Sequence, residues 1–141
     1  MAHVLYFRLD QMLGNVVIVD APRGEALDQL RGVGIQDLVI LISFPRHATL
    51  TLSALVYARM RQAKTIAISD GPLSPIARDV DLLLTVSTSV LDIYTSLAGG
   101  MSLINAICSE VTVRNKKRVS QNLLAVEEAL KAAETHLPSD R

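Results

Sequence analysis

The chain changes abruptly from apolar to polar within residues 38–49, and this change constrains the fold more than any other feature. Residues 38–42 are all aliphatic, whereas Ser43 opens a polar stretch that contains Pro45. An unbroken apolar run of this length predicts a strand buried on both faces, as in parallel sheets. A helical pattern follows. Ligands of such sheets bind at the carboxyl ends of the strands, so residues 43–49 are the expected ligand site.

The start of the following helix gives this site its expected chemistry. Free backbone N–H groups at a helix N-terminus favour an anion, most often phosphate. Ser43 and Thr49 place hydroxyls there, although each would serve equally well as a helix cap. His47 has no visible partner that would make it a catalytic base, so a solvated or helix-starting role is expected.

Strand patterns and helix patterns alternate along most of the chain. The expected strands are residues 16–20, 38–43, 65–69 and 82–86, and the expected helices are residues 2–13, 25–31, 48–62, 91–113 and 117–135, with a single helical turn at 75–77. Leu27 and Leu30 are expected to face inward. The alternation predicts an α/β fold, a doubly wound parallel sheet with helices on both faces.

A second polar stretch follows the last expected strand. Ser87, Thr88 and Ser89 end that strand on the same side of the sheet as Ser43, so they are candidates for the rim of the ligand site. The alternative is that Ser89 caps the next helix together with Asp92. Both interpretations stay open at this point.

Composition restricts the class of protein. The 141 residues suit one domain, and 14 basic residues balance 14 acidic ones, which argues against binding nucleic acid through net charge. The basic run from Arg114 to Arg118 is expected to be a solvated corner. No apolar run reaches the roughly 18 residues of a membrane span. The single cysteine, Cys108, excludes an internal disulfide and supplies no metal cluster, so a cytoplasmic protein without cofactor is expected.

Several segments, in this order and spacing, resemble one known family. They are residues 37–46, 63–70, 74–77 with Asp79 and Asp81, and 101–106. Together they resemble SIS (sugar isomerase) phosphosugar-binding domains, and most of all the effector domains of RpiR/MurR-type bacterial transcriptional regulators. The resemblance covers nearly the whole chain, from His3 to Leu130. It implies a flavodoxin-like SIS fold and a bound phosphorylated sugar.

The chain departs from the family pattern in two places. The family's phosphate loop commonly reads Ser-x-Ser-Gly-x-Thr; Ser43 matches its first serine, whereas Pro45, Arg46 and Ala48 replace the other three residues. Regulators often carry such a loop, and the Arg46 guanidinium is expected to replace the lost hydroxyls. The chain also begins at the family's first helix, so the single domain expected over residues 1–141 would lack the first strand and the regulator's helix-turn-helix.

The resemblance implies a phosphosugar sensor rather than an enzyme. The expected ligand-binding residues are Ser43, Arg46, His47, Thr49, Ser87 and Ser89, with no catalytic residue and no metal. DNA would be contacted only through a helix-turn-helix domain that this chain does not contain. The alternative is an aldose–ketose phosphosugar isomerase, which needs a placed base; Glu110 and His47 are the candidates. A third hypothesis is a scaffold that only dimerises.

The last expected helix carries a narrow apolar row. Its members alternate three and four residues apart: Val119, Leu123, Val126 and Leu130. This spacing suits a partner helix, either within the chain or in a second copy. Because SIS domains typically pair, a homodimer or tetramer is expected.

Overall fold

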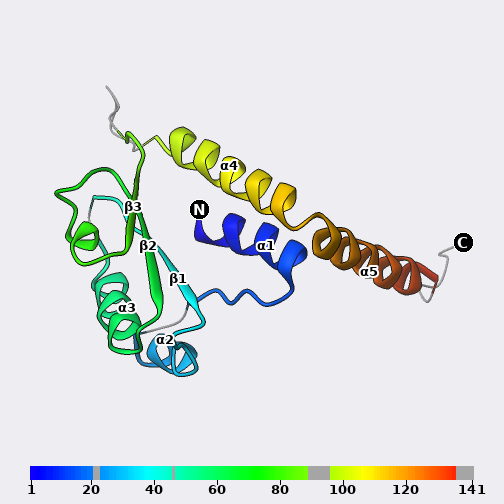
Figure 1. Ribbon diagram of the computed structural model, residues 1–141, viewed down its shortest axis with the longest axis horizontal. Helices are drawn as coiled ribbons and strands as arrows, with labels where there is room; N and C mark the ends of the chain where they lie inside the picture. Colours follow the sequence, from blue (N-terminus) through cyan, green and yellow to red (C-terminus); the bar gives the residue numbers. More distant parts are fainter. Residues whose placement is uncertain (21–22, 46, 89–95, 136–141) are drawn as a thin grey trace, which may run out of the picture. The chain divides into compact units, whose positions relative to one another are not determined.

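The computed structural model describes residues 1–20, 23–45, 47–88 and 96–135 (Figure 1). They form two compact parts, which we describe separately. The sheet unit contains Met1 and Val19–Leu103, and the helical unit contains Ala2–Ile18 and the chain from Ile104 onward. The elements in order are α1 (Ala2–Leu13), α2 (Arg23–Gln29), β1 (Leu38–Ile42), α3 (Thr49–Met60), β2 (Lys64–Ser69), the 3-10 helix η1 (Pro75–Ala77), β3 (Leu82–Thr85), α4 (Ala98–Arg114) and α5 (Lys116–Thr135).

The sheet unit is built on three parallel strands in the order β1-β2-β3 (Figure 1). In the register, Leu38 lies opposite Lys64, and Ile66 lies opposite Leu82. All three strands therefore end at the same edge, which we call the carboxyl edge; the opposite one is the amino edge. The predicted α/β class with a parallel sheet is confirmed.

One face of this sheet carries the core. Its buried cluster consists of Leu30, Leu41, Ala54, Leu55, Ala67 and Ile76, contributed by β1, β2, α3, η1 and the turn after α2. The other face is less covered, because Leu38 and Leu82 remain 54% and 48% exposed. Burial of β1 on both faces was therefore a wrong expectation. Within the described sheet β1 is an edge strand, and only Leu41 in it is fully buried.

Three further expectations need correction. Residues 16–20 form no strand, and Val17 is 73% exposed; no described strand lies beside this segment, and an extended segment without a neighbour has no ladder to join. In α2, Ala26 is buried where Leu27 was expected, and Leu27 is 37% exposed. α4 begins at Ala98 and residues 96–97 are not helical, so the helix expected over residues 91–113 begins later than predicted; residues 91–95 lie outside the described part.

The helical unit packs α1 against α5. The predicted helix 2–13 is confirmed, with Leu5 and Leu9 buried. Gly14 ends it in the left-handed region at φ +67°, and its N–H bonds the Asp10 carbonyl at 2.7 Å, as in a glycine-terminated helix. Asn122 in α5 donates its side-chain N–H to the Met12 carbonyl at 2.9 Å, which joins the two helices.

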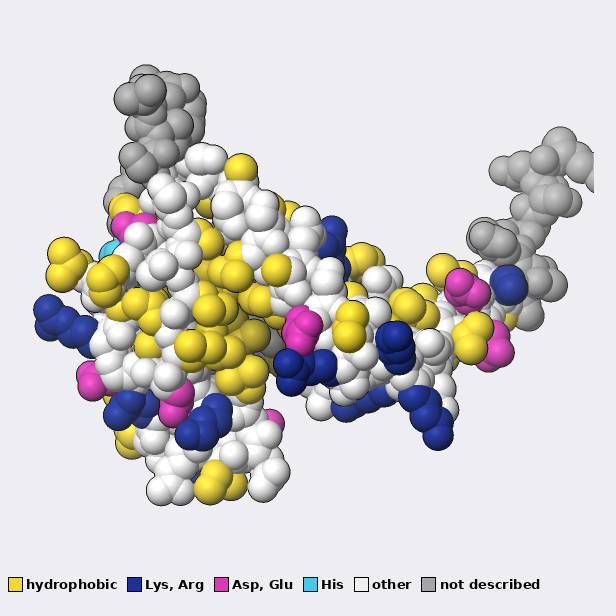
Figure 2. All heavy atoms as spheres, turned by 45° about the horizontal axis from the view of Figure 1, so that its top comes forward, with side chains coloured by type: hydrophobic (Ala, Val, Ile, Leu, Met, Phe, Trp, Pro, Cys, Tyr) yellow, Lys and Arg dark blue, Asp and Glu magenta, His cyan; other side chains and the backbone are white. Residues whose placement is uncertain are grey.

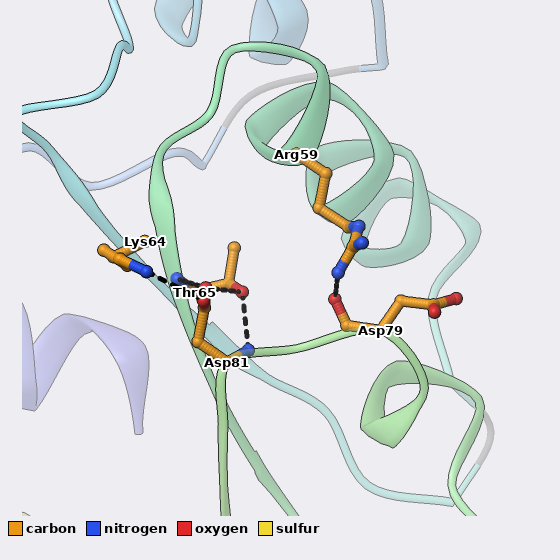
Figure 3. A network of polar contacts seen from close by, with 5 residues as sticks. All are labelled: Arg59, Lys64, Thr65, Asp79 and Asp81. Carbon is orange, nitrogen blue, oxygen red and sulfur yellow. Dashed lines mark hydrogen bonds and ion pairs between the residues drawn. The ribbon is translucent and has the colours of Figure 1, made fainter.

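A polar network holds the amino edge of the sheet (Figure 3). The Asp81 carboxylate accepts the Thr65 N–H at 2.8 Å, the Thr65 hydroxyl at 2.9 Å and the Lys64 ammonium at 3.2 Å. The Thr65 hydroxyl in turn accepts the Asp81 N–H at 3.1 Å. These bonds, the Thr65 hydroxyl first, lower the pKa of Asp81 from 3.8 to about 2. Next to them, Arg59 donates to the carbonyl of Asp79, whose φ is +62°. The network joins the starts of β2 and β3.

Candidate functional site

A second polar network lies at the carboxyl edge, where β1 and β2 end. Ser69, the last residue of β2, is fully buried, and its hydroxyl contacts the Ser43 carbonyl at 2.7 Å and the Asp70 carboxylate at 3.0 Å. The Ser43 N–H donates to the Ile68 carbonyl at 3.1 Å, which continues the β1–β2 ladder by one residue. The backbone of Ser43 is thus held by the neighbouring strand β2, independently of the contacts of its side chain.

The imidazole of His47 connects this edge to η1. Its Nδ1 lies 2.8 Å from the Ser43 hydroxyl, and its Nε2 lies 3.5 Å from the Ser74 hydroxyl, at the long limit of a hydrogen bond. Ser43 is 7% exposed and Ser74 is 6% exposed, whereas His47 is half-buried. Since Ser74 directly precedes η1, these contacts join residues that follow β1 with residues that follow β2.

The structure brings together only some of the predicted site residues. Ser43 and His47 bond each other, so His47 has a hydroxyl partner, although no orienting carboxylate of the kind that a catalytic base needs is among its described contacts. Thr49 is the exposed first residue of α3; the N-cap is Ala48, with no side-chain cap bond, so neither Ser43 nor Thr49 caps this helix. Ser87 is exposed just after β3, with no hydrogen bond to Ser43 or His47 among the contacts described. Arg46 and Ser89 lie outside the described residues, and their roles stay predictions.

Sequence reasoning missed Ser74 and the role of Asp70 at this edge. Both flank the turn at Gly71, between the strand expected over residues 65–69 and the helical turn expected at 75–77. Their proximity to Ser43 follows from β2 being the direct neighbour of β1, with Leu41 opposite Ala67. This proximity could have been predicted from the sequence. Asp70 and Ser74 also follow a predicted parallel strand, and the carboxyl end of that strand must share an edge with Ser43.

A hollow of about 330 Å³ lies in the helical unit and is bordered by Arg8, Met12, Asn105, Cys108, Ser109 and Thr112. Burial raises the pKa of the Cys108 thiol. Neither Ser43 nor His47 borders this hollow, so the candidate site is defined by its polar network.

Basic side chains gather where α4 passes into α5 (Figure 2). They border a hollow of about 460 Å³ and comprise Arg114, Lys116, Lys117 and Arg118. Arg114 pairs with Glu110 at 2.5 Å, and Arg118 donates to the Asn15 side chain at 3.1 Å. All four residues are exposed, which agrees with the expected solvated corner.

The donor set at the carboxyl edge suits an anion with hydroxyl groups. Serine hydroxyls donate to or accept from a ligand, and the backbone N–H groups at the start of α3 favour negative charge. Within the described ranges no group of three or more metal-ligating side chains occurs. No described helix has the length and apolarity needed to cross a membrane. Glu110, one candidate base, is engaged with Arg114 on the exposed side of α4.

Comparisons with known proteins identify the family and the fold. The sequence model of the SIS domain matches residues 1–113. A search of curated proteins found no match. Among solved structures, the chain is similar to the sugar isomerase domain of an RpiR transcription factor from Sphaerobacter thermophilus, with TM-score 0.79 and 27% identity over 90% of this chain and 71% of that one.

Two more distant structures share the fold. The NanR protein of Vibrio vulnificus, complexed with ManNAc-6P, has TM-score 0.74 and 14% identity; the match covers 93% of this chain but only 50% of NanR. A protein of Listeria monocytogenes described as a sugar-phosphate isomerase has TM-score 0.70 and 19% identity, with 86% and 66% covered. The chain thus spans half to two thirds of the length of these two proteins.

Proposed function

This chain belongs to the SIS domain family, and on that basis we propose that it is the phosphosugar-binding effector domain of an RpiR-type bacterial transcriptional regulator. The observation that carries the proposal is the buried Ser43–His47–Ser74 network at the carboxyl edge, next to the start of α3. Ser43 occupies the position of the first serine of the family's phosphate loop. DNA would be bound by a helix-turn-helix domain outside this chain.

The site would hold the phosphate through the Ser43 hydroxyl and the backbone N–H groups at the start of α3. Thr49, exposed in the first turn of α3, would add a hydroxyl. Arg46 would contribute a guanidinium, and Ser87 and Ser89 would border the sugar; these contacts follow from the family resemblance. Binding would shift the arrangement of subunits and thereby the affinity for DNA.

Calorimetry with a panel of hexose and hexosamine phosphates tests this proposal. Each phosphorylated sugar is paired with the corresponding unphosphorylated sugar, and we expect measurable heat for a phosphosugar only. Ser43→Ala should weaken binding, whereas Ser53→Ala, which removes a hydroxyl bonded to the Thr49 carbonyl on α3, should leave it unchanged. Equal affinity for a sugar and its phosphate would contradict the proposal.

The likeness to the Listeria protein keeps isomerisation as the alternative. That reaction moves a proton between neighbouring carbons and needs a base that contacts the substrate. His47 bonds two serine hydroxyls and no carboxylate, so no orienting acid accompanies it among the described contacts. We expect no solvent deuterium in a phosphosugar incubated with the protein. Incorporation that disappears in His47→Asn or Glu110→Gln would favour the enzyme.

We further propose that the chain pairs through α5. Val119 is buried within the helical unit, but Leu123 is 42% exposed and Leu130 is 59% exposed. The later members of the apolar row on α5 are therefore available to a second copy of the chain. Apolar side chains are visible along this helix in Figure 2. The Leu123→Glu/Leu130→Glu variant should be a folded monomer by light scattering and circular dichroism. A variant that unfolds would place the row in the core, and one that stays dimeric would place the interface elsewhere.

A further inference from the structure

The carboxyl edge contains an arrangement that a simple anion site does not require. One imidazole lies between two nearly buried serine hydroxyls, with Ser43 at Nδ1 and Ser74 at Nε2. A neutral imidazole has one N–H donor and one acceptor nitrogen, whereas the imidazolium has two donors and no acceptor. The charge state of His47 therefore decides which way the two hydroxyl protons point.

In the neutral state, one of the two hydroxyls must donate its proton to the ring. That hydroxyl then has no proton left for a ligand and presents only lone pairs, which repel an anion. In the protonated state, both ring N–H groups donate to the serine oxygens. Both hydroxyl protons are then free to point away from the ring, and the ring itself carries a positive charge.

We propose that His47 is a positioning residue that couples anion binding at this edge to the uptake of one proton. Its protonation turns the Ser43 and Ser74 hydroxyls into donors for a doubly charged oxyanion such as a phosphate monoester. The inference rests on the proposed function, because it takes the phosphate group to bind at this network. His47 acts through the two serines and does not itself need to touch the ligand.

Among the described hydrogen bonds of the ring, no second titratable group takes part: at β1 and at η1 the partners are the uncharged Ser43 and Ser74. At the end of β2, the charged neighbour is Asp70, whose carboxylate contacts the Ser69 hydroxyl. Carboxylates in general are ionised throughout the range of about pH 5 to 8 in which imidazoles change charge, so a change of affinity in that range is not expected from a carboxylate. Arg46, the preceding residue, lies outside the described part and keeps its charge at every pH considered.

Sulfate is the decisive probe, because its charge is constant over the range of about pH 5 to 8 in which imidazoles titrate. We expect the affinity of the whole chain for sulfate to fall about tenfold between about pH 5.5 and pH 7.5, the range in which imidazoles in general lose a proton. Calorimetry in two buffers of different ionisation enthalpy should show about one proton taken up per sulfate at about pH 7.

Two variants separate positioning from a merely structural role. His47→Asn retains a group that reaches Ser43, and His47→Gln retains one that reaches Ser74, but neither can gain a proton. Both should remain folded by circular dichroism and should bind sulfate with an affinity that changes less than about twofold over the same pH range. His3→Gln and His136→Gln, which remove the other two histidines, should keep the tenfold change.

Each outcome decides something. Sulfate binding by the wild type without pH dependence, or a pH dependence that survives in both His47 variants, would overturn the inference and leave the proposed function standing. Proton-coupled sulfate binding with phosphosugars bound no better than sulfate would support the inference and remove the phosphosugar assignment. Failure to bind sulfate and phosphosugars alike, measured at about pH 5.5 where the donors face outward, would overturn both.

Discussion

The two ends of one small sheet carry polar networks of different character. At the amino edge, every proton has one possible direction: the Thr65 N–H and the Lys64 ammonium can only donate, and the Asp81 carboxylate only accepts (Figure 3). At the carboxyl edge, hydroxyls and an imidazole meet, and each can donate or accept. The first arrangement fixes a shape, whereas the second can rearrange its protons around a ligand without moving heavy atoms.

The difference has a physical cause in the partners that each end offers. Asp81 accepts three bonds from its neighbours, and the Thr65 hydroxyl is both donor and acceptor within the same pair, so the proton of that hydroxyl is committed to Asp81. The hydroxyls of Ser43 and Ser74 each have one partner in the ring of His47 and retain further capacity. Substitutions at the two ends should therefore affect different properties of the protein.

The largest expected effect comes from the core beneath the carboxyl edge. Ile76 is fully buried in η1, two residues after Ser74, so Ile76→Ala should lower the free energy of unfolding by about 2–5 kcal/mol, measured by urea denaturation. Leu73→Ala, the matched control, removes a side chain that is 95% exposed and should change it by less than about 0.5 kcal/mol. A small cost for Ile76→Ala would mean that the site is held independently of the core.

An intermediate effect is expected at the amino edge, and it depends on pH. The folded-state pKa of Asp81 is lowered from 3.8 to about 2, so the stabilisation is fully present above the ordinary value and is lost as pH falls through about 2. Asp81→Asn should therefore be less stable than wild type at neutral pH, and the difference should shrink steadily below about pH 4.

The neighbouring aspartate provides the control for this test. Asp79 contributes its carbonyl, not its carboxylate, to the contact with Arg59, and asparagine tolerates the same left-handed backbone. In urea denaturation series at several pH values, Asp79→Asn should show no such convergence with wild type. A difference for Asp81→Asn that is the same at every pH would mean that the carboxylate charge does not stabilise the sheet.

The smallest effect on stability is expected for the serine of the site. Ser43→Ala leaves the backbone bond to Ile68 in place and removes one hydroxyl, so the free energy of unfolding should fall by no more than about 1.5 kcal/mol. The same variant should lose most of its affinity for sulfate in calorimetry. If its loss of stability equalled that of Ile76→Ala, the carboxyl edge would be structural like the amino edge, and the contrast between them would fail.

Local pattern was sufficient for the elements with strong apolar signals. The aliphatic run of residues 38–42 gave β1, and the spacing of Leu5 and Leu9 with the stop at Gly14 gave α1 to the residue. The same kind of run misled at residues 16–20, because strand formation needs a neighbour and no local pattern supplies one. In the seven-residue α2, a shift of one residue rotates the inward face by about 100°, and Ala26 is buried in place of Leu27.

The candidate site, too, was predictable in part from local pattern and in part not. Ser43 was found because it ends a recognisable strand before a helix, and this depends only on nearby residues. Its carbonyl contacts Ser69, which is 26 positions away, and its partner His47 contacts Ser74, which is 27 positions from His47; both contacts exist because β2 lies directly beside β1. Strand order is a property of the assembled sheet, so the contact between His47 and Ser74 was not visible in the sequence.

The central position of β2 has a consequence for how the sheet unit opens. Its backbone is bonded on both sides, to β1 and to β3, and Thr65, Ala67, Ile68 and Ser69 are all fully buried. Amide hydrogens in such a strand exchange with solvent deuterium only when the whole unit unfolds, so they should be the slowest of the sheet. Ser69 ends this strand and contacts the Ser43 carbonyl. Ser43 is therefore attached to the strand whose amide hydrogens should exchange last. A ligand bound at Ser43 would meet a backbone that is already ordered before the ligand arrives.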